Sequence, residues 1–152
     1  FVYYFKDHQQ LAMAIEKTYI MIKPDGFQRQ EILGDIINRF IRKGLKLLAM
    51  KTMLPTKEIA EQHYADLSAK PFFGELIEYI TSGKVVALVF EGESAVSVGR
   101  TLLGATNPQQ AAVGTIRGDY ALTIAANIAH GSDTPENALK EIGIWFAGET
   151  IA

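Results

Sequence analysis

The run from Lys84 to Phe90, Lys-Val-Val-Ala-Leu-Val-Phe, constrains the fold more than any other part of the chain. Its residues are apolar at successive positions and rich in β-branched side chains, so they predict a strand that is apolar on both faces. A second strand is predicted at 17–23, where the turn signal Pro24-Asp25-Gly26 ends it. A third is predicted at 45–54 and is stopped by Pro55. Together these runs predict a sheet.

Helices are predicted between and after these strands, from apolar residues at helical spacing and from end signals. Gly44 is the expected C-cap of the first helix, and the last begins with Thr134 as N-cap and Pro135 at its first position. The predicted helices are 32–43, 56–67, 74–80, 93–103 and 135–146. Residues 104–119 are predicted to be a long loop, a kind of segment that is usually functional or disordered. A short helix and a strand then lead to His130.

The order of these elements is strand–helix–strand, a helical insertion, then strand–helix–strand. This order suits an α/β protein with a split βαβ sheet and helices on one face. A length of 152 residues suits one domain, which we place at 13–152. Because Met13-Ala14-Ile15 would make a natural start, residues 1–12 are interpreted as a vector-derived or otherwise extraneous leader, with an ordinary N-terminal extension as the alternative.

Composition argues against several classes of function. Lys and Arg number 15 and Asp and Glu 17, so the formal net charge of −2 gives no global basic field for nucleic acid or an anionic membrane. A local arginine cluster can still bind anions. The absence of cysteine removes disulfides, thiol catalysis and cysteine-ligated metals, and it fits a reducing compartment. Since no apolar run is long enough to cross a bilayer, we expect a cytoplasmic protein that does not bind membranes.

The leading candidate for chemistry is the segment 127–133, Asn-Ile-Ala-His-Gly-Ser-Asp, which places His130 among small residues and beside a hydroxyl and a carboxylate. Small neighbours let a large substrate approach, and a neutral imidazole is a good nucleophile near pH 7, because its reference pKa is about 6.5. Glu141, on the following helix, could accept a hydrogen bond from the ring and fix its tautomer. The alternative for His130 is a histidine at a strand end with its hydrogen bonds satisfied and no role in chemistry. The alternative for Glu141 is an ordinary exposed glutamate on a helix.

Candidates for phosphate and base binding are individually weaker. Arg100 precedes the glycine-bearing loop, and Arg117 lies within it. The planar guanidinium of an arginine can donate two parallel hydrogen bonds to a phosphate. The alternative for both is a solvated surface charge. Phe72 and Phe73 could form a stacking surface, although adjacent loop aromatics are more often partial core. Lys23 at a strand end could reach a phosphate or a hydroxyl, or simply be solvated.

Several familiar motifs are absent from the chain. It contains no G-x-x-x-x-G-K-[ST], which excludes the ordinary P-loop, and no G-x-G-x-x-G or G-x-S-x-G. The three histidines, His8, His63 and His130, lack metal-ligand spacing. A dedicated zinc site is therefore not expected.

A set of motifs in a fixed order carries a resemblance to a known family. The motifs are Lys23-Pro24-Asp25-Gly26, His63-Tyr64, Lys70-Pro71-Phe72-Phe73, Thr106-Asn107-Pro108, Gly114-Thr115-Ile116-Arg117-Gly118-Asp119, the segment 127–133 and Glu141-Ile142. Over roughly residues 16–147 the chain closely resembles nucleoside diphosphate kinase, and the N-x-x-H-G-S-D element is highly specific. The resemblance implies a ferredoxin-like fold with a four-stranded antiparallel sheet and a helical insertion between strands 2 and 3.

The resemblance also implies an activity: transfer of the γ-phosphate of a nucleoside triphosphate, typically ATP, to a nucleoside diphosphate. His130 would be phosphorylated at Nδ1, which predicts ping-pong kinetics. Its imidazole would be held by Glu141, which Ser132 steadies, with Tyr64 beside the transferred phosphate. Lys23 counts among the catalytic residues and, with Asn127, matches residues that bind the sugar hydroxyls. The other matched positions bind phosphates, namely Arg100, Thr106 and Arg117, or the two faces of the base, namely Phe72 and Ile124.

Cofactor and partners follow from the same resemblance. Mg²⁺ would be held mainly by the nucleotide phosphates, with Asp133 touching it through water. Because the family forms hexamers and tetramers, a homo-oligomer with broad base and sugar tolerance is expected. Two positions depart from the family pattern: Ala126, where many members carry Arg, and Val113, where many carry Pro, which puts the rigidity of the following loop in doubt.

Two rival hypotheses remain beside an active kinase. One is a regulatory or nucleic-acid-binding member with secondary kinase activity, against which the net charge of −2 argues. The other is a catalytically silent assembly protein. The intact set of matched residues argues against it, because folding alone does not require that set.

Overall fold

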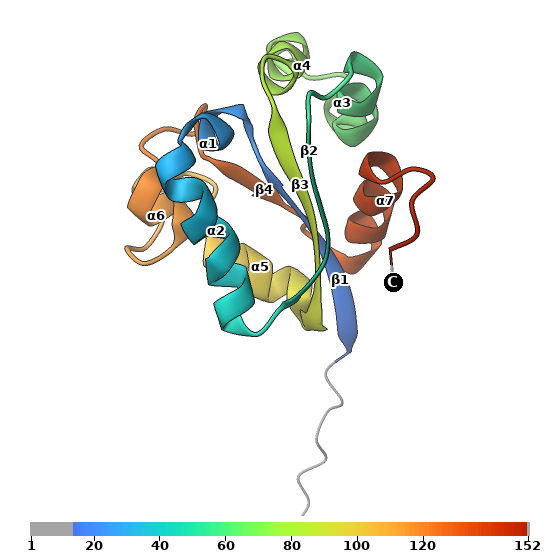
Figure 1. Cartoon of the computed structure of the whole chain (residues 1–152). Helices are drawn as coiled ribbons and strands as arrows, with labels where there is room; N and C mark the ends of the chain where they lie inside the picture. Colours follow the sequence, from blue (N-terminus) through green and yellow to red (C-terminus); the bar gives the residue numbers. More distant parts are fainter. Residues whose placement is uncertain (1–13, 152) are drawn as a thin grey trace, which may run out of the picture.

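One antiparallel sheet forms the centre of the protein (Figure 1). The computed structural model describes residues 14–151, so the interpretation of residues 1–12 as a leader lies outside the described residues and stays a prediction. The strands are β1 (Ile15–Ile22), β2 (Lys46–Met53), β3 (Val85–Glu93) and β4 (Ala129–Gly131). Their order in the sheet is β2-β3-β1-β4, and β1 pairs with β3 along its whole length. This order confirms the predicted four-stranded split βαβ sheet.

Helices connect the strands and cover them. The longer ones are α2 (Gln30–Lys43), α3 (Lys57–His63), α4 (Phe73–Thr81), α5 (Ala95–Leu103) and α7 (Pro135–Trp145). The shorter ones are α1 (Pro24–Gln28), α6 (Ile116–Tyr120) and the 3-10 turns η1 (Ala65–Leu67) and η2 (Pro108–Gln110). Because α3, η1 and α4 all lie between β2 and β3, the predicted helical insertion is confirmed. None of the helices in residues 14–151 combines the length and apolarity that a membrane span needs.

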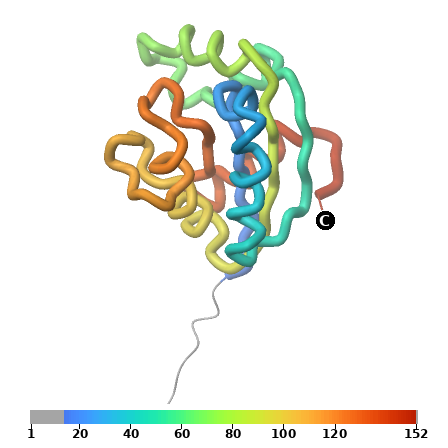
Figure 2. The backbone as a smooth tube through the Cα atoms, turned by 60° about the vertical axis from the view of Figure 1, so that its left-hand side comes forward, coloured from blue at the N-terminus to red at the C-terminus, as the bar shows by residue number. Residues whose placement is uncertain are grey.

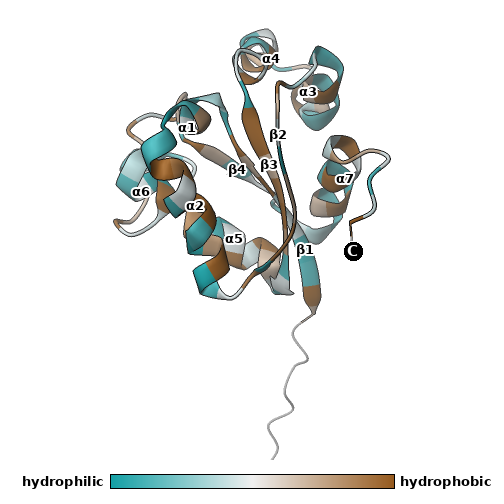
Figure 3. Ribbon diagram, viewed as in Figure 1, coloured by the Kyte–Doolittle hydropathy of each residue, from teal (hydrophilic) through white to brown (hydrophobic). Residues whose placement is uncertain are grey.

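The helices cover both faces of the sheet, so the prediction of helices on one face was wrong (Figure 1). Leu88 and Phe90 of β3 pack in one core with α2 and α5, whereas Ala87 and Val89 pack in a second core with α3, α4 and α7. Alternate residues of a strand point to opposite faces, and here both sets are apolar. Figure 3 shows this hydrophobic run along β3. The run that opens the sequence analysis therefore required cover on both faces.

Helix ends follow the predicted signals where a cap is present. Gly44 ends α2 with a φ of 105°, and the hydroxyls of Thr56 and Thr134 accept hydrogen bonds at the starts of α3 and α7. The turn predicted at Pro24 is instead the short helix α1, which Pro24 begins.

The segment between α5 and β4 also differs from its prediction. The loop predicted at 104–119 contains η2 and most of α6, and His130 lies within β4 rather than after a strand. These elements are too short for periodicity to reveal. In Figure 2 the segment, coloured gold to orange, folds as a lobe beside the sheet, which brings it to the strand that carries His130.

Candidate active site

A cavity of about 480 Å³ lies beside β4 and α7. It is lined by every residue of the site that the family resemblance implied, except Ser132, which is buried and bonds to Glu141. The lining residues from that set are Lys23, Tyr64, Phe72, Arg100, Thr106, Arg117, Ile124, Asn127, His130, Asp133 and Glu141. These residues are spread over much of the sequence, so the fold brings them to one place.

His130 is presented by a strained turn. It pairs with Met21 of β1, and the chain reaches it through a three-residue γ-turn in which Ala129 N donates to Asn127 O (2.8 Å). Ile128, the central residue, has a φ of 73°. A branched residue in this region costs about 1–3 kcal/mol, so surrounding contacts must hold it.

The Lys-Pro-Asp-Gly motif at 23–26 supplies those contacts. The carboxylate of Asp25 accepts a hydrogen bond from Ile128 N (2.9 Å), and Lys23 N donates to Ile128 O (2.9 Å). A Cβ at Gly26 would lie 2.8 Å from Ile128 O, so only glycine permits this approach. Lys23 was predicted to be a ligand, but no sequence signal indicated that Asp25 and Gly26 shape the turn before His130.

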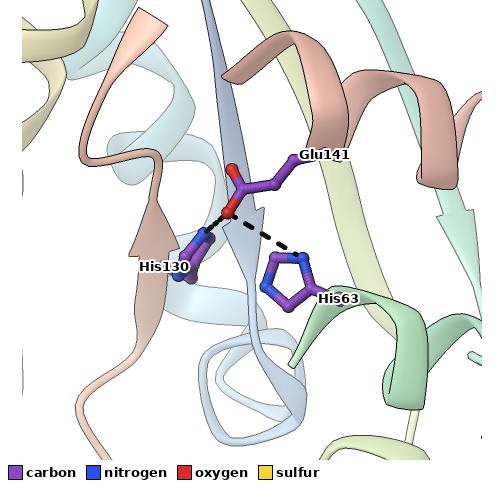
Figure 4. Close-up of side chains that lie close together, drawn as sticks. All are labelled: His63, His130 and Glu141. Carbon is purple, nitrogen blue, oxygen red and sulfur yellow. Dashed lines mark hydrogen bonds and ion pairs between the residues drawn. The ribbon is translucent and has the colours of Figure 1, made fainter. Parts of the chain in front are cut away.

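Glu141 of α7 holds the imidazole of His130 (Figure 4). Its Oε1 lies 2.8 Å from Nε2 of His130, and its other oxygen accepts a short hydrogen bond from the hydroxyl of Ser132. A carboxylate only accepts hydrogen bonds, so Nε2 carries the proton and Nδ1 keeps a free lone pair. Glu141 is 9% exposed, so its interpretation as an ordinary exposed helix glutamate was wrong.

Arg117 is buried and ties the lobe to the strand of His130. Its guanidinium donates to the carbonyls of Gly104 (2.8 Å), Asn127 (3.2 Å) and Ala129 (2.6 Å). Burial and the charge of Arg100 lower the pKa of Arg117 to about 10. A surface-charge interpretation is therefore wrong for Arg117, whereas Arg100 is exposed on the cavity wall. Three bonds to carbonyls leave Arg117 with unused N–H groups for an anion.

Ion pairs and backbone bonds hold the loop whose rigidity Val113 had put in doubt. Val113 itself is exposed, but Asp119 accepts hydrogen bonds from Gly114 N (2.8 Å) and from Arg39 (2.7 Å). Arg39 also donates to Gly114 O (3.1 Å). The loop that carries Arg117 is thus tied to α2 without the proline.

Lys23 and Asn127 form a linked pair at the cavity wall. The Lys23 ammonium donates a short hydrogen bond to Asn127 Oδ1, and Asn127 Nδ2 donates to Thr106 O (3.0 Å). Burial lowers the pKa of Lys23 to about 8, and the Arg117 charge acts in the same direction, whereas Asp25 opposes it. Lys23 is therefore not the solvated strand-end lysine of the alternative interpretation.

The two adjacent phenylalanines separate. Phe72 is 49% exposed at the mouth of the cavity, where Ile124 is 58% exposed, whereas Phe73 packs against the core on the α7 side of the sheet. Tyr64 lines the same cavity, and burial raises the pKa of its hydroxyl. Only Phe72 of the pair is thus free to meet a ligand.

Asp133 offers an exposed carboxylate oxygen at the cavity. It accepts a hydrogen bond from Asn137 Nδ2 (2.7 Å), and this bond lowers the pKa of Asp133. The group is therefore ionised near neutral pH. An ionised oxygen ligand beside solvent fits Mg²⁺, which prefers oxygen and keeps several waters.

His63 lines the inner wall, and Trp145 is buried behind it, although neither was predicted to belong to the site. The ring of His63 lies 4.6 Å from that of His130, and Trp145 Nε1 donates to His63 Nδ1 (3.1 Å). Ligand atoms of His63, His130 and Glu141 all lie within 4.8 Å of one another, which sequence spacing could not reveal. The His-Tyr motif pointed to His63, but no sequence signal pointed to Trp145.

Most of the chain is similar to proteins of one known family. The family model described as nucleoside diphosphate kinase matches residues 16–151. A nucleoside diphosphate kinase of Brevibacillus brevis is 50% identical over 137 residues, which cover 90% of this chain and 92% of that protein. One of Spinacia oleracea, named as chloroplastic, is 49% identical over 98% of this chain and 63% of its own length. The crystal structure of the enzyme from Encephalitozoon cuniculi matches with a TM-score of 0.86 and 52% identity, over 90% of this chain and 92% of that one.

Proposed function

The chain belongs to the nucleoside diphosphate kinase family, and we propose that His130 carries the reaction by accepting and returning a phosphoryl group. The protein is a phosphotransferase of nucleotide metabolism. In the first half-reaction the γ-phosphate of a nucleoside triphosphate, typically ATP, passes to His130 and the diphosphate leaves. In the second half-reaction another nucleoside diphosphate takes it, which gives ping-pong kinetics.

The contact between His130 and Glu141 is the observation that supports this proposal most directly. With Nε2 bonded to Glu141 Oε1 at 2.8 Å, the lone pair of Nδ1 attacks the γ-phosphorus. The new N–P bond forms as the bond between this phosphorus and the β–γ bridging oxygen breaks, and both electrons leave with the diphosphate. Return of the group to a second diphosphate reverses these changes, so no proton has to leave Nε2.

The phosphates bind through cations and hydroxyls on the wall beside His130. We assign Arg100, Thr106 and Arg117 to the phosphates and Tyr64 to the transferred group, and all four residues line the cavity that contains His130. Charge in the loose transition state is spread over the phosphoryl oxygens, so fixed donors there stabilise it. Arg117 therefore has two roles in this proposal: it holds three backbone carbonyls in the structure, and it stabilises charge on the transferred phosphoryl group.

The nucleoside binds toward the mouth of the cavity. Lys23 and Asn127 hydrogen-bond the sugar hydroxyls, and the base lies between Phe72 and Ile124. Every base has a π-face, so stacking on an aromatic ring does not select among bases. The enzyme accordingly accepts nucleotides with different bases and sugars.

Mg²⁺ is the cofactor in this proposal. It would be held mainly by the nucleotide phosphates, and Asp133 would contribute through water, as its exposed and ionised carboxylate allows. When bound, the ion neutralises part of the phosphate charge.

A homo-oligomer, hexamer or tetramer, is the proposed assembly. Strand β2 lies at an edge of the sheet, and Met50 on it is 54% exposed, as expected of a strand that pairs or packs with another copy. Light scattering after size-exclusion chromatography tests this, and a monomer at micromolar concentration would contradict it. We also keep the cytoplasm as the proposed location, and recovery in an organelle fraction, as the name of the spinach relative implies for that protein, would contradict it.

A phosphoenzyme assay tests the function. The protein is incubated with Mg²⁺ and ATP labelled at the γ-phosphate, freed of nucleotide, and then given GDP or dTDP. We expect acid-labile label on His130 that moves to either acceptor. Failure of folded protein to take up label, or acid-stable label, would contradict the proposal.

A further inference from the structure

Two histidines lie near one oxygen of Glu141. Nε2 of His130 lies 2.8 Å from Oε1, and Nδ1 of His63 lies 3.9 Å from the same atom (Figure 4). A neutral imidazole carries one N–H, on either nitrogen. If His63 carried it on Nδ1, a small movement would make it a second donor to Oε1, and sharing that oxygen would weaken its hydrogen bond with His130.

Trp145 decides which nitrogen of His63 carries the proton. Its indole Nε1–H lies 3.1 Å from Nδ1 of His63, and an indole N–H can only donate. Nδ1 of His63 must therefore be the acceptor, with its proton on Nε2. The 3.9 Å separation from Glu141 is consequently neither a hydrogen bond nor an ion pair.

The same contact disfavours a second proton on His63. An imidazolium would turn its Nδ1–H against the indole N–H, and both groups would donate with no acceptor between them. Burial lowers the pKa of His63 to about 2, which agrees with a permanently neutral ring. A metal ion on His63, His130 and Glu141 is disfavoured too, because the lone pair of Nδ1 is already engaged.

We propose that Trp145 is a positioning residue for phosphotransfer: by donating to His63 Nδ1, it reserves Oε1 of Glu141 for His130. The inference rests on the proposed function, because it concerns the histidine assigned as nucleophile. When Glu141 accepts from Nε2 of His130, Nδ1 of His130 stays unprotonated and nucleophilic. A second donor on Oε1 would weaken the bond that fixes the tautomer of His130, and the fraction of His130 with its proton on Nδ1 would not react.

Three variants isolate this effect. Trp145→Phe keeps a buried ring but removes the donor. The double variant Trp145→Phe with His63→Phe also removes the competitor for Glu141. Tyr19→Phe is the matched control, because Tyr19 stacks on Trp145 at 5.6 Å and its buried hydroxyl has no hydrogen-bond partner among the described residues.

Rates of phosphoenzyme formation distinguish positioning from packing. Trp145→Phe should slow the step about tenfold at saturating ATP, the effect of roughly one lost hydrogen bond, with KM little changed. The double variant should recover to within about threefold of the wild type, and Tyr19→Phe should match the wild type. A double variant as slow as Trp145→Phe would overturn the proposal, since a packing defect would not be relieved by a second substitution.

Nitrogen-15 NMR of labelled histidine gives a readout that needs no activity. In the wild type, Nδ1 of His63 should show the shift of an unprotonated nitrogen, and in Trp145→Phe it should move toward the protonated value. A protonated Nδ1 in the wild type would overturn the proposal even if Trp145→Phe does not fold. Loss of the proposed function would show differently, as absence of label on His130 with the tautomer of His63 unchanged.

Discussion

The inner and outer ends of the cavity are built on different principles. At the inner end Glu141, Ser132 and Arg117 are buried and His130 is half-buried, and each is held by hydrogen bonds of defined direction. At the outer end the main apolar contacts, Phe72 and Ile124, are about half exposed. The inner end therefore holds its side chains in defined positions, whereas the outer end provides an apolar contact surface without directional bonds.

This difference matches what each end must do in the proposed reaction. A nucleophile works only if one nitrogen is free and one is protonated, so its partners must be buried and directional. A base of any kind can be held by contact area alone, so its site can stay open. Precision at one end and tolerance at the other are therefore compatible in a single cavity.

The largest effect is expected at His130. His130→Ala should abolish phosphoenzyme formation and turnover, because the other imidazole that the described residues place there, His63, has its Nδ1 lone pair engaged by Trp145. The fold should persist, since the buried bond between Ser132 and Glu141 does not involve the ring. Label uptake together with circular dichroism measures both, and turnover comparable to the wild type in a normally folded variant would remove His130 from the mechanism.

A smaller but still large effect is expected for Arg117→Lys. An ammonium cannot span the carbonyls that the guanidinium joins, and a buried carbonyl left without a partner costs about 1–3 kcal/mol. We expect kcat/KM to fall about 100-fold, together with a lower Tm. The control is Arg100→Lys, an exposed side chain with no hydrogen bond or ion pair within residues 14–151, which should keep the wild-type Tm. Equal losses of Tm in both variants would erase the distinction between a buried and an exposed arginine.

Lys23 lies where the two ends meet, and its ionisation gives a pH test. Because the pKa of Lys23 is lowered to about 8 mainly by burial, its charge is present below pH 8 and lost as the pH rises through that value. Nucleotide binding that needs the charge should weaken accordingly, so kcat/KM should fall about tenfold between pH 7 and pH 9.

The matched variant is Lys23→Arg, since a guanidinium stays charged over this range. Its kcat/KM should be lower at pH 7 but flat up to pH 9. A profile with the same inflection as the wild type would assign the titration to another group. The free energy of unfolding depends on pH in the opposite direction to kcat/KM. Between about pH 8 and the ordinary lysine pKa of 10.5, Lys23 is more protonated in the unfolded state than in the native state. The contribution of Lys23 therefore makes the protein more stable as the pH rises through this range.

The smallest effect is expected at the outer end. Phe72→Ala removes one stacking face that is already 49% exposed, so KM should rise about fivefold, near the lower limit for loss of a stacked base. The rise should be the same for ADP, GDP and dTDP, and kcat should hardly change. A much larger rise for one base would mean that the outer end selects bases.

Sequence patterns predicted much of the frame. The run at 84–90, the C-cap Gly44 and the N-caps Thr56 and Thr134 each act through neighbours within a few residues, and the elements they predicted are present. The prediction that helices cover one face of the sheet was wrong. It placed all the helices on one side, although β3 is apolar on both faces and is covered on both. The sequence patterns also missed α1 and misplaced the short helix and the strand before His130, because α1, α6 and β4 are too short to show a period.

The candidate site divides in the same way. The candidate site residues could be predicted from the sequence, and all but Ser132 line one cavity. The contacts that hold them in place could not be predicted. No local pattern shows that Asp25 and Gly26 hold Ile128, that Arg117 spans three carbonyls, or that Val113 is compensated by Arg39. Each of these contacts joins side chains to backbone groups of other segments.

By itself the sequence determined the longer strands and helices and the residue types that are available for chemistry, because caps, turns and periodicity act locally. Tertiary structure alone decided the proton on His63, the partner of Glu141 and the exposure of Phe72 against the burial of Phe73. Trp145 and His63 are separated by 82 positions in the chain, and only packing of α3 against α7 sets the 3.1 Å between them. Hydrogen-bond direction depends on such distances, and no local pattern contains them.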